Sequence, residues 1–203
     1  MNEAQVKAYL LEQDPKLAKV LKAGVSCPFF EEPKISQYRL LSCLVEIIIG
    51  QQVSNSAAQK IWNNFKKNTK TLKVLEEKIL GLENHPDKRE GLSGQKITYL
   101  KGIVVAMRDQ EIKMNQFSKQ SDDEVMENLT RLKGIGPWTA EMFLMFGLHR
   151  LDVFSNTDYG LIQSVKKLYK NKTLSIKEID KITHKWRPYR SVASWYLWLD
   201  HDG

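Results

Sequence analysis

The chain has 203 residues, of which 42% are hydrophobic, enough for one domain or for two small ones that share an interface. Thirty-one Lys and Arg residues against 24 Asp and Glu residues give a formal net charge of +7, which favours a polyanionic partner. Two cysteines exclude a disulfide framework and a four-cysteine cluster, and no apolar run is long enough to span a bilayer. We therefore expect a reduced intracellular protein, cytoplasmic in a prokaryote or nuclear in a eukaryote.

Every element predicted along the chain is a helix. Asp14 followed by Pro15 is typical of an N-cap and a first helical position, and Gly24 predicts the end of that helix. Residues 38–49 are apolar enough for a buried helix, and the glycine turn at 91–96 leads into an amphipathic one. No alternating run is long enough to predict a strand, so we expect an all-α fold.

Two serines mark further helix starts. Ser121 precedes Glu124, and Ser175 precedes Glu178, at the spacing of a capping box. The first of these helices, over 122–132, leads into a glycine-containing segment.

The segment RLKGIGPWTAEMF, residues 131–143, predicts two helices joined by a tight turn. Gly134 and Gly136 flank one isoleucine, and Pro137 suits the first position of the second helix. Glycine permits positive φ and lacks a Cβ, so a phosphate chain can approach the backbone closely. The helix N-terminus behind it also suits a phosphate. The turn is therefore either a helix-hairpin-helix that grips a nucleic-acid backbone without reading sequence, or a plain helix–helix corner.

Positive charge is concentrated near the C-terminus. Residues 160–190 contain nine Lys or Arg and only two acidic residues. Such a run is either a solvated helix face or a surface for a polyanion.

The string LKGIGPWTAEMFLMFGLHRLDVFSNTDYGL resembles the hairpin and catalytic loop of the helix-hairpin-helix DNA glycosylase superfamily. Other segments resemble its 3-methyladenine DNA glycosylase II type: IIIGQQVSNSAAQKIWNNF, GLSGQKITYLKGIV, KWRPYRSVASWYLW and DPKLAKVLKAG. The resemblance covers roughly residues 13–200 in the family's order. It implies two helical subdomains with a cleft between them. One spans 37–145 and ends in the hairpin, and the other combines 1–36 with 146–203 and carries the catalytic aspartate.

Asp158 occupies the family's catalytic position, although its sequence context alone predicts only the cap of a helix that starts near Tyr159. Breaking an N-glycosidic bond builds positive charge on the deoxyribose, and a fixed anion stabilises that state. The same carboxylate can take a proton from an attacking water. An N3- or N7-alkylated purine is already cationic and leaves as a neutral base, so it requires no strong general acid.

Trp138 stands where bifunctional members of the superfamily carry a nucleophilic lysine, so the resemblance implies a monofunctional enzyme with water as the nucleophile. Its indole could wall a pocket and stack on an electron-poor base. Trp198 falls at the family's base-stacking tryptophan, and Met142 where some relatives present an aromatic residue. Core packing is the alternative for both tryptophans.

Gln51 and Gln52 lie in the family's wedge segment, which fills the gap left by a flipped nucleotide. The alternative is a pair of exposed glutamines at a helix end. The resemblance also implies roles for the hairpin backbone. Its DNA-backbone contacts fall on Gly134, Ile135, Gly136 and Thr139, and a monovalent cation, Na⁺ or K⁺, falls on the carbonyls of Thr130, Leu132 and Ile135.

The resemblance implies a monomeric glycosylase that removes alkylated purines from double-stranded DNA and requires no cofactor. Two cysteines leave no room for an iron–sulfur cluster. The alternatives are a glycosylase for uracil, hypoxanthine or an oxidised purine, and a non-catalytic DNA-binding module that uses the hairpin as a scaffold.

Overall fold

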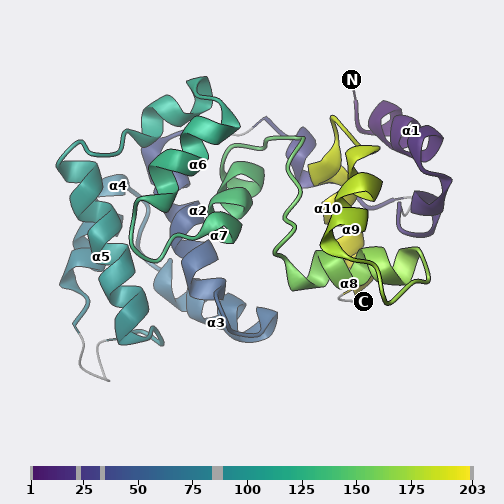
Figure 1. Ribbon diagram of the computed structural model, residues 1–203. Helices are drawn as coiled ribbons and strands as arrows, with labels where there is room; N and C mark the ends of the chain where they lie inside the picture. Colours follow the sequence, from purple (N-terminus) through teal and green to yellow (C-terminus); the bar gives the residue numbers. More distant parts are fainter. Residues whose placement is uncertain (1, 22–23, 33–34, 84–88, 202–203) are drawn as a thin grey trace. The chain divides into compact units, whose positions relative to one another are not determined.

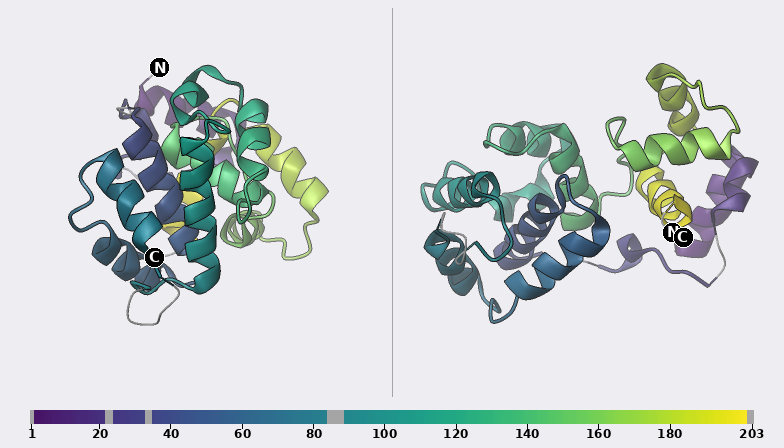
Figure 2. Two further views of the ribbon diagram at one scale, coloured as in Figure 1. Left: turned by 90° about the vertical axis from the view of Figure 1, so that its left-hand side faces the viewer. Right: turned by 90° about the horizontal axis from the view of Figure 1, so that it is seen from below.

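The computed structural model describes residues 2–21, 24–32, 35–83 and 89–201 (Figure 1). Within these ranges every regular element is helical and there is no strand, so the predicted all-α class is confirmed (Figure 2). The chain divides into two compact units. Unit 1 contains residues 1–32 and 149–203, and unit 2 contains residues 33–148. The boundaries expected from the sequence, at 37 and 145, lie a few residues inside unit 2.

The helices of unit 1 are α1 (Glu3–Gln13), η1 (Pro15–Lys19), η2 (Pro28–Phe30), α8 (Tyr159–Leu168), α9 (Ile176–His184) and α10 (Arg190–His201). Those of unit 2 are α2 (Gln37–Gly50), α3 (Asn55–Phe65), α4 (Leu72–Gly81), α5 (Gly94–Arg108), η4 (Met114–Lys119), α6 (Asp122–Thr130), α7 (Pro137–Met142) and the π-helical η5 (Phe143–Gly147). No helix in the described ranges is long and apolar enough to cross a membrane.

Side-chain caps begin most of the α-helices. Ser121 and Ser175 form the two capping boxes that their spacing to Glu124 and Glu178 predicts. Ser93 likewise caps α5, the helix expected after the glycine turn. These caps satisfy N–H groups that have no partner within their helix.

Helix α2 is the centre of unit 2. It packs against α3, α4, α5, α7 and the π-helical turn η5. Seven of its fourteen residues are buried apolar side chains. Such a helix, apolar on most of its circumference, is stable only when other helices cover it. The burial of α2 agrees with the buried helix that the sequence predicts over residues 38–49.

In unit 1 a buried carboxylate joins segments that are far apart in the sequence. Asp14 caps η1, and its Oδ2 accepts hydrogen bonds from the Tyr169 hydroxyl at 2.6 Å and the Trp186 indole at 3.0 Å. The helix predicted from Pro15 to Gly24 is wrong in type and length, because only a five-residue 3₁₀ helix forms there. Residues 22 and 23 lie outside the described ranges. The cap was predicted correctly, but its tertiary partners were not.

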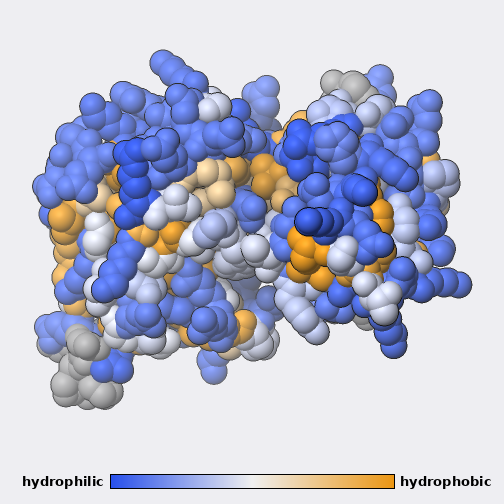
Figure 3. Space-filling model, in the orientation of Figure 1, coloured by the Kyte–Doolittle hydropathy of each residue, from blue (hydrophilic) through white to orange (hydrophobic). Residues whose placement is uncertain are grey.

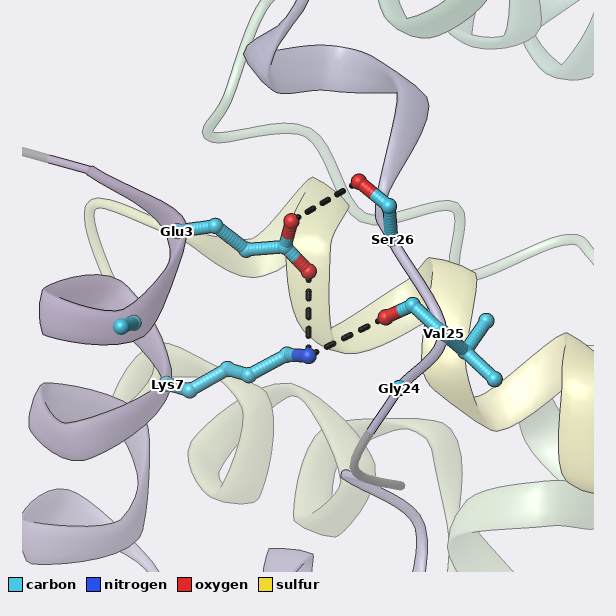
Figure 4. Close-up of a pocket in the computed structure, with 6 residues that line it drawn as sticks. Glu3, Lys7, Gly24, Val25 and Ser26 are labelled. Atoms are coloured by element: carbon cyan, nitrogen blue, oxygen red, sulfur yellow. Dashed lines mark hydrogen bonds and ion pairs between the residues drawn. The ribbon is translucent and has the colours of Figure 1, made fainter.

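A second carboxylate ties α1 to the segment that follows η1 (Figure 4). Glu3 accepts hydrogen bonds from the Ser26 hydroxyl, the Cys27 amide and the Tyr196 hydroxyl of α10. Lys7 bridges Glu3 to the carbonyl of Val25. These contacts anchor the N-terminal helix in the same unit as α8 and α10.

Candidate functional site

The predicted hairpin is present between α6 and α7. The chain leaves α6 through two consecutive turns, in which the Leu132 amide donates to the carbonyl of Leu129 and the Ile135 amide to that of Leu132. Gly136 is the N-cap of α7 and Pro137 its first residue. Gly136 offers no side-chain cap, whereas Ser121 caps the preceding helix. No N-cap side chain therefore competes with an outside acceptor for the N-terminus of α7.

The two glycines of the hairpin have different surroundings. Gly134 has φ +90°, and a Cβ on it would lie 2.1 Å from the ring of Tyr99. Gly136 has φ −90° and ψ 177°, which any residue can adopt, and a Cβ there would meet nothing within 4 Å. The expectation that both glycines leave space for a phosphate is therefore corrected for Gly134, whose missing Cβ makes room for an aromatic ring. Only Gly136 faces open space.

Two of the four residues expected to bind the DNA backbone are turned into the protein. Ile135 is buried, and Thr139 is only 2% exposed. The Thr139 hydroxyl accepts a hydrogen bond from the side chain of Gln51. Any contact of Thr139 with a phosphate would have to come from its backbone N–H, because its side chain is not accessible.

The structure separates the two glutamines of the predicted wedge. Gln51 is half-buried, and its Nε2 donates to the Gly134 carbonyl at 3.1 Å and the Thr139 hydroxyl at 2.9 Å. The prediction that Gln51 acts as a wedge is corrected, because this amide braces the hairpin from inside unit 2. Gln52 is exposed and has φ 56°. The wedge prediction now applies to Gln52 alone.

The pocket residues expected on α7 differ in accessibility. Trp138, the second residue of the helix, is half-buried and keeps part of its surface exposed. Met142 is only 4% exposed. Met142 is therefore corrected from a pocket residue to a core residue, since a side chain so deeply buried offers no surface to a base.

Of the carbonyls predicted to hold a cation, that of Thr130 ends α6, and those of Leu132 and Ile135 lie in the hairpin. The Leu132 carbonyl oxygen accepts a hydrogen bond from the Ile135 amide, and its second lone pair can face a cation. Carbonyl oxygens suit a hard cation such as Na⁺ or K⁺. No group of three or more His, Cys, Asp or Glu side chains in the described part of the chain could hold a metal ion.

Asp158 is the N-cap of α8 and is 9% exposed. Its Oδ1 accepts hydrogen bonds from the Leu161 amide at 2.8 Å and from the Trp198 indole at 3.2 Å. The helix cap that the sequence predicts is therefore real, and a side chain of α10 joins it. A carboxylate at a helix N-terminus with a second fixed donor has a defined orientation, as an electrostatic catalyst requires.

The loop that carries Asp158, residues 149–158, is fastened to the start of α10. Arg190 holds the carboxylate of Asp152 through Nε at 2.7 Å and the Asp152 carbonyl through Nη2 at 2.6 Å. The Ser191 hydroxyl accepts a hydrogen bond from the Val153 amide and donates one to the carbonyl of Arg150. Sequence reasoning missed these residues, because a lone Asp, Arg and Ser carry no motif.

Gly160 is another position that the sequence did not single out. A Cβ on Gly160 would lie 3.3 Å from Oδ1 of Asp158 and 3.5 Å from the indole of Trp198. The glycine therefore leaves the space in which the carboxylate and the indole meet. The sequence indicates this role of Gly160 only through its position, two residues after Asp158.

The basic stretch at 160–190 is partly neutralised within unit 1. Arg187 and Arg190 pair with Asp152, and Lys167 pairs with Asp200. The other exposed lysines of this stretch are at 170 and 172 between α8 and α9, at 177 and 181 on α9, and at 185 directly after it. The face shown in Figure 3 is likewise mostly hydrophilic, with its apolar residues in separate patches.

Both cysteines are packing residues. Burial raises the pKa of Cys27 and of Cys43 to about 12, so each thiol stays protonated at neutral pH. Metal binding requires the thiolate form.

The fold and site together define a class. An all-α chain with a glycine hairpin, followed by a buried helix-capping aspartate, has the parts of a helix-hairpin-helix DNA glycosylase. No protein-family model matches the chain.

Known proteins narrow this class to a family. The DNA-3-methyladenine glycosylase of Saccharomyces cerevisiae is 31% identical over 94% of this chain and 77% of its own length. The crystal structure of the Bacillus halodurans DNA-3-methyladenine glycosidase is 30% identical with a TM-score of 0.74, over 97% of this chain and 88% of that one. Schizosaccharomyces pombe 3-methyladenine DNA glycosylase in complex with abasic DNA is 26% identical with a TM-score of 0.78, over 96% and 95%. The chain belongs to the DNA-3-methyladenine glycosylase family.

Proposed function

We propose that this chain is a monofunctional DNA glycosylase that hydrolyses the N-glycosidic bond of alkylated purines, of the 3-methyladenine and 7-methylguanine type, in duplex DNA. The observation that carries the proposal is Asp158, which two donors orient at the N-terminus of α8. The membership of the chain in its family supports the choice of substrate.

The chemistry assigned to Asp158 needs no partner acid. As the glycosidic bond lengthens, positive charge develops on the deoxyribose, and the carboxylate stabilises it. Asp158 then accepts the proton of the water that attacks the sugar. The donors from Leu161 and Trp198 fix the carboxylate before the substrate arrives, so it need not reorient during the reaction.

Trp138 supports hydrolysis without strand cleavage. An indole cannot form a Schiff base with the opened sugar, so no lyase step follows base release. Its exposed part can stack on a cationic alkylated base more strongly than on a neutral one.

In this proposal the protein binds the DNA backbone without sequence preference. The open side of Gly136 lets a phosphate reach the N-terminus of α7, and the exposed lysines of α9 and of the segments beside it add a salt-dependent attraction. A monovalent cation on the hairpin carbonyls would strengthen the positive field at that phosphate. Gln52 would fill the gap left by the flipped nucleotide, and the protein would act as a monomer.

The test is incubation of the protein with a methylated duplex, with the released bases identified by mass. We expect free 3-methyladenine or 7-methylguanine, and a strand that stays intact until alkali is added. The matched control is Asp158→Asn on the same duplex, together with wild-type protein on an unmethylated duplex. Absence of released base, or a covalent adduct trapped by borohydride, would contradict the proposal.

A further inference from the structure

Residues 50–53, which we call the Gln52 turn, have an unusual backbone. Gln51 has φ −57° and ψ 126°, and Gln52 has φ 56°. The Val53 amide points back to the carbonyl of Gly50 at 3.5 Å. These values match a type II turn, whose third position normally takes glycine or asparagine because φ is positive there. A glutamine at this position is strained, and the surrounding structure must hold it.

Lys96 supplies part of that support. Its Nζ donates to the carbonyl of Ile49 at 2.8 Å and to that of Gln51 at 2.9 Å. The Gln51 carbonyl belongs to the central peptide of the turn. A type I turn differs from a type II turn mainly by a flip of this peptide, which would turn the oxygen away from Lys96. The ammonium group therefore favours the conformation in which Gln52 has positive φ.

Lys96 lies in the first turn of α5, from which its side chain reaches the Gln52 turn. Partial burial lowers the pKa of its amine, and the carbonyls that it contacts lie at the negative end of α2. An ammonium group held at a helix C-terminus is favourable there, since it meets carbonyls that the helix leaves without partners.

The side chain of Gln51 connects the same turn to the hairpin. Its amide reaches the Gly134 carbonyl and the Thr139 hydroxyl, on the two sides of the glycine turn. Gln51 thus contributes a carbonyl to Lys96 and an amide to the hairpin. The Gln52 turn and the hairpin are joined by hydrogen bonds inside one unit.

We propose that Lys96 and Gln51 are positioning residues, which hold the exposed Gln52 in its left-handed conformation and fix its distance from the hairpin. Gln52 then meets the gap in the strand while the hairpin holds a phosphate of the same duplex. The inference rests on the proposed function, because a wedge is needed only by a protein that removes a nucleotide from the stack.

The experiment compares affinity for two duplexes of one sequence, undamaged and with a stable abasic-site analogue, and uses their ratio as the readout. Lys96→Met should lower affinity for the abasic duplex about 5- to 10-fold, from the strain that is no longer supported. Affinity for the undamaged duplex should fall no more than in Lys101→Met, which removes the same charge from the same helix. Gln51→Met should weaken both complexes, because it loosens the hairpin, and should weaken the abasic complex more, because it also releases the Gln52 turn from the hairpin.

A double-mutant cycle separates positioning from general stability. If Lys96 acts through Gln52, then Lys96→Met should lower the ratio no further in a Gln52→Ala background. Additive losses in the ratio, a loss in Lys96→Met that is equal on both duplexes, or a wild-type protein without preference for the abasic duplex would overturn the proposal. Should Lys96→Met fail the check of folding by circular dichroism, the Gln51→Met and Gln52→Ala cycle applies the same test.

These binding measurements do not depend on base release. A wild-type protein that prefers the abasic duplex but releases no alkylated base would contradict the proposed function and leave the positioning role intact.

Discussion

The hairpin of unit 2 and the Asp158 loop of unit 1 present their functional groups in opposite ways. The hairpin is braced from behind by Gln51, while a Cβ on Gly136, on its outer side, would meet nothing within 4 Å. The loop is braced at Asp152 by Arg190, but the functional carboxylate of Asp158 is itself part of the local structure. In the hairpin, the residues proposed to face DNA differ from those that hold the turn in place. At Asp158, one side chain has both the proposed catalytic role and a structural role.

This difference predicts how each region tolerates substitution. Outer hairpin residues can change DNA affinity without changing folding, because their support lies elsewhere. A change at Asp158 acts on both activity and stability unless the new side chain still caps α8. The four predictions that follow use this distinction, from the largest expected effect to the smallest.

Asp158→Asn should lower the rate of base release at least about 10²-fold, as the loss of one electrostatic stabiliser does. Asparagine caps helices as well as aspartate does, so the free energy of unfolding should hardly change. Asp158→Ala should lose activity and about 1 kcal/mol of stability, because the cap is gone. Single-turnover kinetics on a methylated duplex and denaturant unfolding measure the two effects. Excision at the wild-type rate by the asparagine variant would reduce Asp158 to a helix cap.

Gly136→Val should weaken binding to damaged and undamaged duplexes alike, by at least about tenfold, because a hydrogen bond to a charged phosphate contributes about 1.5–3 kcal/mol. Gly134→Ala should instead destabilise the protein by about 2–4 kcal/mol, from positive φ and overlap with Tyr99. A salt series of binding measurements and thermal unfolding distinguish the two variants. If folded Gly136→Val protein binds like the wild type at every salt concentration, the hairpin is only a structural corner.

Trp198→Phe keeps an aromatic ring but removes the N–H that Asp158 accepts. We expect base release to slow about tenfold, since a hydrogen bond to a charged group is lost, with unchanged affinity for undamaged DNA. Gly160→Ala crowds the same contact and should have a smaller effect in the same direction. Full activity in Trp198→Phe with loss in Trp198→Ala would show that stacking, and not the indole N–H, is what matters.

The capping boxes should produce a small dependence of stability on acid pH in both units. Hydrogen bonds from Ser121 lower the pKa of Glu124, and those from Ser175 lower the pKa of Glu178. A carboxyl with a lowered folded pKa stabilises the fold above its unfolded value, about 4.3, and loses this contribution as pH falls through the folded value. Thermal unfolding between pH 6 and about pH 3 should therefore drop less in Glu124→Gln and Glu178→Gln than in the wild type. Parallel curves for variants and wild type would contradict this.

Features with partners only a few residues away could be predicted from the sequence. Ser121 and Glu124, Ser175 and Glu178, and the cap at Asp158 all bond within three residues of themselves. Gly136 and Pro137 likewise signal the start of α7 through local backbone geometry. Helix propensity and capping are local effects, so their spacing is visible in the chain.

The roles of several site residues depended on distant partners. Gln51 bonds to residues 83 and 88 positions further along, and Trp198 to an aspartate 40 positions before it. Nothing in the local pattern distinguishes Gln51 from Gln52, or a buried Met142 from an exposed one. Such contacts depend on how helices pack against one another, which no spacing rule encodes.

By itself, the sequence determined that the chain is helical, where several of its helices begin, and which aspartate follows the hairpin in the order typical of the family. Only the tertiary structure decided that Gly134 makes room for Tyr99, that Gln51 braces the hairpin, and that an indole orients Asp158. The physical reason is the distance along the chain between residues that interact. Caps and turns are stabilised within one or two turns of backbone, whereas a side chain's partners in the core are chosen by the packing of helices from distant parts of the chain.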